Sequence, residues 1–288
     1  MLMTIERVGI VGGGQMGAGI AEVCATAGVD VIVREINKEA ASLGESRLRR
    51  SLERAVTKGK LPEEDRDAAI GRVRFTTDLE AMADRQLVIE AVVEHEPLKV
   101  EIFKALDNIV TSGEAIFASN TSSLPITRLA TCTNRPDHVI GMHFFNPVPV
   151  MALMELITTV VTDPEVAAIA EEFATETLSK TVVKAKDRAG FVVNLLLVPY
   201  MTEAMRMYEA GHATAEDIDN GMKLGANHPM GPLELADFIG LDTMKLVADV
   251  LFEEYKLPHY APPPLLVRMV EAGMLGRKTG RGFYEYPT

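Results

Sequence analysis

The chain has 288 residues, of which 41 are acidic and 29 are basic, so its formal net charge is −12. A hydrophobic content of 47% with 24% charged residues excludes extended disorder and is typical of a globular protein large enough for two domains. The acidic balance excludes nucleic acid and anionic membranes as main partners, because both require clustered lysine and arginine. The acidic composition still allows a small anionic ligand that local basic residues or helix N-termini bind.

In the first part of the chain, short β-branched runs alternate with longer amphipathic patterns. The predicted strands are Val8–Val11, Val29–Val33, Val73–Phe75, Leu87–Glu90, Ala115–Ala118, Val139–Met142, Met154–Ile157 and Thr181–Val183. The predicted helices between the earlier strands are Ala18–Ala27, Lys38–Lys58 and Leu98–Val110. Strand, helix and strand at this spacing indicate βαβ units and a mostly parallel sheet. The later strands follow one another more closely, which predicts an antiparallel edge.

After Asp187 the pattern changes to helix after helix. Thr214 and Asp217 have the spacing of a capping box, and several prolines separate the helical segments. We therefore predict two domains. An α/β domain spans residues 1–187, and an all-helical domain spans residues 188–288.

Cysteine usage and the apolar segments bear on the cellular setting. Cys24 and Cys132 lie far apart without a CxxC pair, which excludes a disulfide framework and a zinc cluster. We predict no metal site and a reducing, cytoplasmic setting. The first residues lack the basic and long apolar regions of a secretory signal peptide. The most apolar later stretch, Phe191–Tyr200, is too short and too interrupted to span a bilayer.

Three glycines, Gly12, Gly14 and Gly17, form the spacing GxGxxG between the first predicted strand and the first predicted helix. In a dinucleotide site such glycines allow a tight turn, close approach of the backbone to the pyrophosphate, and close packing of helix on strand. The helix N-terminus supplies free N–H groups and the positive end of its dipole. Together with Gln15 and Met16, these glycines are the predicted cofactor-binding residues. The loop and the βαβ units predict a Rossmann-type, doubly wound α/β domain.

Glu35 follows the second predicted strand and lies 35 − 17 = 18 residues after Gly17. An acid near this position binds the ribose hydroxyls of NAD, and its charge repels the 2′-phosphate of NADP. We therefore predict NAD as the cofactor. The neighbouring Arg34 leaves NADP open, since an arginine there is able to bind that phosphate.

Two polar clusters follow later strands. One is Ser119–Ser123, and the other begins at His143, with Glu155 at a distance of 155 − 143 = 12 residues. The carboxyl ends of the strands form the edge at which open α/β sheets bind ligands. A histidine with a carboxylate partner transfers protons near neutral pH. The spacing makes His143 a candidate general base, while a structural role for a lone histidine stays open.

Further motifs occur in order along nearly the whole chain. They are Gly12–Gly19, Glu90–Glu94, Ala118–Ser123, Gly141–Pro149, Gly190–Asn194, Lys223–Ala226, His228–Pro232, Gly240–Thr243 and Gly276–Tyr284. Through them the sequence resembles the L-3-hydroxyacyl-CoA dehydrogenase family, most closely the stand-alone bacterial 3-hydroxybutyryl-CoA dehydrogenases. The resemblance implies an NAD-dependent oxidoreductase that interconverts an L-3-hydroxyacyl-CoA and the 3-ketoacyl-CoA, with a short acyl chain expected.

The resemblance implies catalytic roles for matching positions. His143 matches the catalytic base of the family, and Glu155 matches the carboxylate that orients and charges it. Ser122 and Asn194 match polar groups that hold the reacting oxygens, so both are implied in catalysis and in substrate binding. Lys278 is similar to a cofactor contact from the second domain.

The resemblance also implies ligand contacts in the first domain. Glu94, Lys99 and Asn120 match residues around the nicotinamide and its ribose. Ser51 and Lys58 match positions that contact the CoA moiety. An equally open alternative is that Ser51 and Lys58 form one polar helix face.

Apolar residues recur at helical spacing in the second domain. They include Leu195, Val198, Met201, Met205 and Tyr208. One thin layer of helices has too little interior to bury all such faces, which predicts a homodimer formed through this domain. The resemblance supports dimerisation. The alternative is that these residues pack only against the first domain and their own neighbours.

Two other functions stay open. One is a dehydrogenase on the same scaffold that acts on a sugar acid, and the other is a non-catalytic NAD-binding protein. Ser122, His143, Glu155 and Asn194 weigh against the second, because a protein that only binds NAD has no use for proton-transfer groups.

Overall fold

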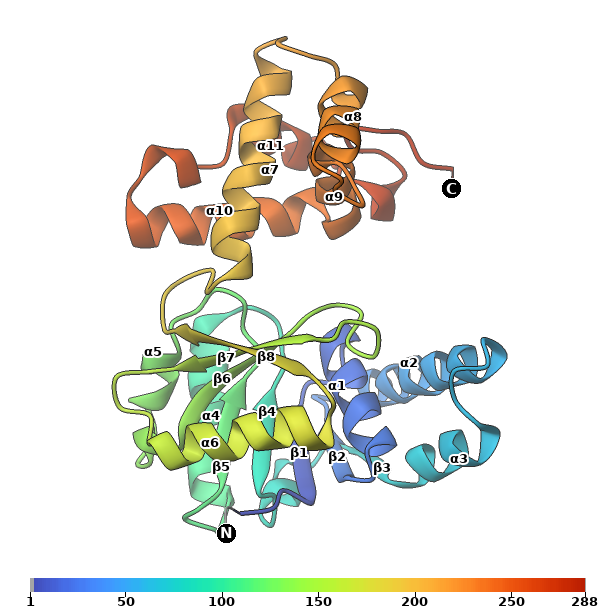
Figure 1. The fold of residues 1–288 in the computed structure, drawn as a ribbon. Helices are drawn as coiled ribbons and strands as arrows, with labels where there is room; N and C mark the ends of the chain where they lie inside the picture. The colour runs from blue at the N-terminus through green and yellow to red at the C-terminus, as the bar shows by residue number, and fades with distance from the viewer. Residues whose placement is uncertain (1–2, 288) are drawn as a thin grey trace. The chain divides into compact units, whose positions relative to one another are not determined.

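The computed structural model describes residues 3–287, which form two compact units that divide between Asp187 and Arg188 (Figure 1). The first unit is built on a sheet, and the second is helical. Within residues 3–287 no helix is long and apolar enough to cross a membrane.

One sheet of eight strands, in the order β3-β2-β1-β4-β5-β6-β7-β8, forms the centre of the first unit. The strands are β1 (Arg7–Val11), β2 (Asp30–Arg34), β3 (Val73–Thr76), β4 (Leu87–Glu90), β5 (Ile116–Ser119), β6 (Val139–Phe144), β7 (Leu153–Thr158) and β8 (Thr181–Lys186). The first six strands pair in parallel, β6 pairs with β7 antiparallel, and β7 pairs with β8 in parallel. The strand order reverses between β1 and β4, and the crevice at such a point is where open α/β sheets bind ligands.

Helices cover both faces of this sheet. They are α1 (Gln15–Thr26), α2 (Lys38–Thr57), α3 (Glu63–Gly71), α4 (Glu96–Ile109), α5 (Ile126–Ala130) and α6 (Pro164–Glu172). Val31 and Val33 of β2 belong to one core cluster with residues of α1, α2 and α6. On the other face Phe103 of α4 meets Phe117 of β5 edge to face, with ring centres 6.3 Å apart. This two-sided packing confirms the predicted doubly wound α/β class.

The sequence patterns did not predict the helices α3, α5 and α6. The closely spaced later strands suggested direct connections, but α6 lies between β7 and β8 and runs across the near side of the sheet in Figure 1. Since β7 and β8 are parallel, the chain needs a crossover between them, and a helix provides it. The predicted antiparallel edge therefore consists of two strands, β7 and β8.

The second unit contains α7 (Val193–Glu209), α8 (Ala215–Gly225), α9 (Pro232–Ile239), α10 (Leu241–Tyr255) and α11 (Pro264–Glu271). Thr214 caps α8 as predicted, since its hydroxyl accepts a hydrogen bond from the Asp217 N–H at 3.1 Å. Val198, Met201 and Met205 of α7 are buried in the core of this unit.

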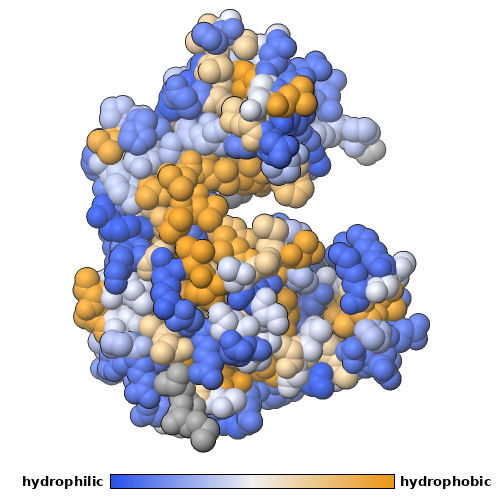
Figure 2. Space-filling model, in the orientation of Figure 1, coloured by the Kyte–Doolittle hydropathy of each residue, from blue (hydrophilic) through white to orange (hydrophobic). Residues whose placement is uncertain are grey.

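The burial of these three residues changes the argument for a dimer. They pack against neighbours within the same unit and are therefore not available for a dimer interface. For these three residues the alternative of packing within the chain applies. Other apolar residues do lie on the surface of the unit, among them Leu196, 71% exposed, and Leu224, 86% exposed. In Figure 2 apolar side chains gather over the first turns of α7.

Candidate active site

The glycine loop joins β1 to α1, whose first two residues are Gln15 and Met16. Gly12 has a φ of +103°, and a Cβ on Gly17 would lie 1.8 Å from the Gly12 carbonyl oxygen, so only glycine allows this approach. A Cβ on Gly14 would meet nothing within 4 Å, and no described side chain caps the start of α1. Open space beside uncapped N–H groups fits the pyrophosphate of a dinucleotide.

Glu35 directly follows β2, and its carboxylate lies beside the glycine loop. Its Oε1 accepts a hydrogen bond from the Gly13 N–H at 2.6 Å, and its Oε2 accepts one from the Ile36 N–H at 3.0 Å. A carboxylate at the end of β2 and next to the loop suits the two hydroxyls of an adenosine ribose.

His143 and Glu155 face each other across the antiparallel strands β6 and β7. The His143 Nδ1 lies 2.7 Å from the Glu155 Oε2, Glu155 is fully buried, and His143 is 7% exposed. A carboxylate removed from water interacts strongly with a protonated imidazole at this distance. Because Nδ1 faces Glu155, proton exchange with a substrate falls to Nε2. The strand register thus brings together the two residues that the sequence had paired by spacing.

Asn120 and Ser122 lie in the turn that follows β5, the strand next to β6. The Asn120 N–H donates to the Glu90 carbonyl at 2.8 Å, and the Phe144 N–H donates to the Asn120 Oδ1 at 2.9 Å. The Asn120 side chain therefore ties the end of β5 to β6, one residue beyond His143. Ser122 is half-buried in the same turn.

Lys99 is buried beneath this edge of the sheet. Its Nζ lies 2.7 and 2.9 Å from the two carboxylate oxygens of Glu90 and 3.1 Å from the Glu94 Oε2. Ser119 donates a hydrogen bond to Glu90 at 2.6 Å, and Thr121 donates one to Glu94. Burial acts to raise the pKa of Glu94, but the Lys99 ammonium and the hydroxyl donors together hold this pKa below its ordinary value. At 1% exposure, the Lys99 ammonium is enclosed by the Glu90 and Glu94 carboxylates, and its contact with the cofactor stays a prediction.

The sequence prediction placed Ser119 and Thr121 in the polar cluster Ser119–Ser123 but assigned neither of them a role. It assigned no role to Glu90 either, although Glu90 begins the motif Glu90–Glu94. An available signal was its place at the end of an apolar strand, nine residues before a lysine on an amphipathic helix (99 − 90 = 9).

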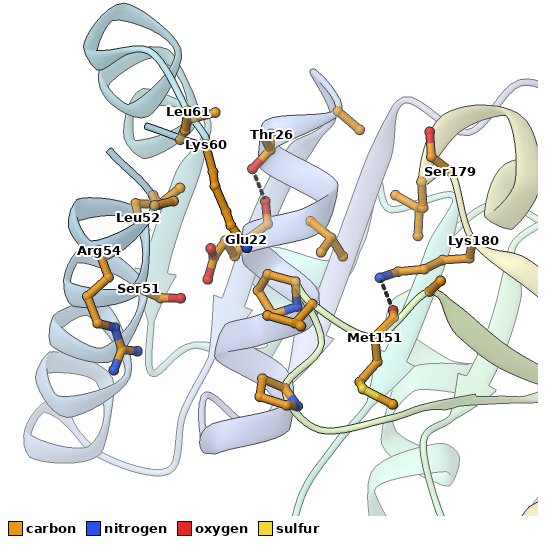
Figure 3. A pocket seen from close by; sticks show the side chains of 18 of the residues that line it. Glu22, Thr26, Ser51, Leu52, Arg54, Lys60, Leu61, Met151, Ser179 and Lys180 are labelled. Carbon is orange, nitrogen blue, oxygen red and sulfur yellow. Dashed lines mark hydrogen bonds between the residues drawn. The ribbon is translucent and has the colours of Figure 1, made fainter. Parts of the chain in front are cut away.

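A cavity of about 820 Å³ opens beside α1 and α2 (Figure 3). Ser51 and Lys58, the positions matched to CoA contacts, both line it, together with Arg54 and Lys60. The basic side chains give this wall a positive charge that suits phosphate groups. Glu22 of α1 also lines the cavity, and burial raises its pKa, against the effects of a hydrogen bond from Ser51 and the charge of Arg54.

Asn194 and Lys278 belong to the helical unit. Asn194 is half-buried in the first turn of α7. The Lys278 Nζ lies 2.5 and 2.6 Å from the two carboxylate oxygens of Asp242. The participation of Asn194 and Lys278 in catalysis and cofactor binding stays a prediction. Within the described part of the chain, no group of three or more His, Cys, Asp or Glu side chains is arranged to hold a metal ion.

A glycine loop at the point of strand reversal, an acid after β2 and a buried His–Glu pair define a dinucleotide-binding oxidoreductase. Residues 7–188 match the NAD binding domain of 3-hydroxyacyl-CoA dehydrogenase, and residues 190–286 match the C-terminal domain of the same enzyme. The chain belongs to the 3-hydroxyacyl-CoA dehydrogenase family, and its first unit binds NAD.

Individual relatives are similar over their whole length. The 3-hydroxybutyryl-CoA dehydrogenase of Mycobacterium tuberculosis H37Rv is 60% identical over 282 residues, which cover 98% of this chain and 99% of the relative. The crystal structure of M. tuberculosis FadB2 has a TM-score of 0.98 at 59% identity and covers 99% of this chain and 100% of its own. The structure of (S)-3-hydroxybutyryl-CoA dehydrogenase PaaH1 from Ralstonia eutropha has a TM-score of 0.94 at 48% identity, with coverage of 99% and 100%.

Proposed function

We propose that this protein interconverts L-3-hydroxybutyryl-CoA and acetoacetyl-CoA by hydride transfer with NAD(H). The observation that carries the proposal is the buried His143–Glu155 pair, 2.7 Å apart, on the sheet edge that also holds the glycine loop. The relatives named for this reaction support the choice of a short acyl chain.

His143 acts as the general base when the alcohol is oxidised. Its Nε2 takes the proton of the 3-hydroxyl group, while Glu155 holds Nδ1 and stabilises the imidazolium that forms. In the reduction direction the same imidazolium returns the proton to the carbonyl oxygen. Bound NAD supplies the hydride acceptor, and NADH the hydride donor. General acid–base catalysis of this kind accelerates a reaction by about 10²–10⁴-fold.

The neighbouring polar residues hold the reactants. Ser122 donates a hydrogen bond to the reacting 3-oxygen, and Asn194 of the helical unit is proposed to do the same. Asn120 and Glu94 hold the nicotinamide end of the cofactor, and Glu35 holds the adenosine ribose. Positioning of this kind accounts for a large part of the rate in cofactor enzymes, because the reacting atoms are held close and aligned.

The CoA moiety is proposed to lie in the cavity beside α1 and α2. Ser51 and Lys58 contact it there, and Arg54 and Lys60 add positive charge for its phosphates. Because Ser51 and Lys58 line the same cavity, we favour a contact with CoA over the alternative that they only form a polar helix face.

We further propose a homodimer formed through the helical unit and a cytoplasmic location. Leu196, Leu224, Phe238 and Leu246 are each at least 46% exposed in that unit, and several large exposed apolar side chains on one small unit are typical of an interface.

The test is the initial rate of NADH oxidation with acetoacetyl-CoA and with longer 3-ketoacyl-CoAs, with NADPH in parallel. We expect acetoacetyl-CoA to be reduced with a higher kcat/KM than a ten-carbon ketoacyl-CoA, and NADH to exceed NADPH. Oxidation of a sugar acid without activity on acetoacetyl-CoA favours the first alternative function. NAD binding without turnover of either substrate favours the non-catalytic alternative.

A further inference from the structure

The segment Phe145–Ala152, here called the connector, joins β6 to β7 and therefore lies between the strands that carry His143 and Glu155. It forms a wall of the 820 Å³ cavity through Pro147, Pro149, Val150, Met151 and Ala152. The wall is apolar, and it faces the polar wall of α2 across α1 in Figure 3.

Lys180 reaches the connector from just before β8. Its Nζ donates hydrogen bonds to two backbone carbonyls of the connector, Val148 O and Met151 O, each at 2.7 Å. Figure 3 shows the bond to Met151. Lys180 is 8% exposed, burial lowers its pKa, and no carboxylate among the described residues is an electrostatic partner of its ammonium. A buried ammonium without an acid is costly, so the two carbonyls are its main compensation.

The connector is held at other points as well. Val148 packs against Gly19 of α1, where an added Cβ would lie 3.0 Å from the Val148 Cβ. The Gln15 side chain donates a hydrogen bond to the Asn146 Oδ1 at 3.0 Å. These contacts hold the first half of the connector against the cofactor helix α1. In the second half of the connector, the Val150 and Met151 N–H groups donate to Pro147 O, the Lys180 ammonium donates to Met151 O, and the Thr181 N–H donates to Ala152 O at 2.8 Å. Lys180 is the side chain that binds Met151 O in this half.

We propose that Lys180 is a positioning residue for the acyl-CoA substrate, a role that rests on the proposed use of the cavity for CoA. By fixing the Val148–Met151 turn, the ammonium sets the apolar wall against which the substrate lies. The His143–Glu155 pair does not depend on Lys180, because the pairing of β6 with β7 holds it. The glycine loop has its own packing through Gly12 and Gly17. Loss of the ammonium is therefore expected to weaken substrate binding selectively.

The experiment compares Lys180→Met, which keeps the length of the apolar stem, with Lys180→Gln, which keeps a shorter donor. Lys184→Met is the matched control, since Lys184 lies on β8 with its side chain 67% exposed and paired with Glu171. We expect the KM for acetoacetyl-CoA to rise at least about tenfold in Lys180→Met and by less in Lys180→Gln. We expect kcat to stay within about threefold, the KM for NADH within about twofold, and the control to behave as wild type.

A purely structural role predicts a lower Tm with an unchanged KM for acetoacetyl-CoA, or equal losses for both substrates, and either result overturns the proposal. If Lys180→Met does not fold, Lys180→Gln carries the comparison. Failure of both variants to fold also overturns it, since Lys180 is then needed for folding itself.

Titration with CoA alone separates this inference from the proposed function. A wild-type protein that binds CoA but does not reduce acetoacetyl-CoA refutes the proposed function. In that case a Lys180→Met protein that binds CoA at least about tenfold more weakly still supports the inference. A wild type that reduces acetoacetyl-CoA, with a Lys180→Met protein of equal KM and equal CoA affinity, refutes the inference alone.

Discussion

Replacing Glu155 by glutamine removes the charge beside His143 and keeps the shape of the side chain. Glu155 is fully buried, and its Oε2 lies 2.7 Å from the His143 Nδ1. A hydrogen bond to a charged group contributes about 1.5–3 kcal/mol. At about 1.4 kcal/mol for each factor of ten, the loss corresponds to a kcat lower by about 10–150-fold. Because glutamine still offers an acceptor oxygen to Nδ1, we expect the lower part of this range.

The assay is steady-state reduction of acetoacetyl-CoA by NADH, with the dissociation constant of NADH measured by fluorescence. We expect Glu155→Gln to leave NADH binding within about threefold of wild type, since the glycine loop makes no use of this residue. His143→Gln is expected to be at least as damaging, and the double variant far less damaging than the product of the two, because the pair acts as a unit. Glu171→Gln, which alters a half-exposed acid on α6, is the matched control and is expected to keep its activity. A Glu155→Gln protein with a lower Tm but near-normal kcat would show that Glu155 only supports the strand, and the reasoning would be refuted.

Three further predictions concern stability and assembly. Lys99→Met leaves Glu90 and Glu94 without their shared cation, and we expect the free energy of unfolding in urea to fall by about 3–5 kcal/mol. A loss under about 1 kcal/mol would show that the buried Lys99 ion pairs do not stabilise the fold. Burial raises the pKa of Glu22 above its ordinary 4.5, so the folded state binds this proton more tightly than the unfolded chain does. The stability that this proton contributes is therefore lost as the pH rises from 4.5 through the pKa of Glu22 in the folded state. Glu22→Gln is therefore expected to raise the Tm more at pH 8 than at pH 4.5, and an equal shift at both values would refute this. Sedimentation at micromolar concentration is expected to show a dimer, whereas a species of 31.4 kDa alone would exclude it.

Much of the fold could be predicted from the sequence because its strands are short apolar runs with clear boundaries. Val31, Val33, Leu87 and Ile89 are all fully or almost fully buried, as their continuous apolar surroundings indicated. Helix α6 was missed because spacing alone does not show the direction of a strand. The parallel pairing of β7 with β8 depends on contacts between segments that are distant in the chain.

The candidate site, like the fold, could be predicted from the sequence only in part. Glu155 lies twelve positions after His143, and this spacing suggested a return between adjacent strands, which the register of β6 and β7 provides (155 − 143 = 12). Lys99 was assigned to the site through the family resemblance alone, and Lys180 was assigned no role. A lysine is usually solvated, and whether its ammonium is buried against carboxylates or carbonyls depends on tertiary packing that composition does not encode.

The most direct test of the account is a single-turnover measurement of hydride transfer from bound NADH to acetoacetyl-CoA, in wild type and in His143→Gln. If His143 is the general acid–base residue, the wild type oxidises the bound NADH completely. The rate is then at least about 100-fold lower in His143→Gln, with the dissociation constant of NADH unchanged. Equal rates in the two proteins, or no oxidation of NADH by the wild type, would contradict it.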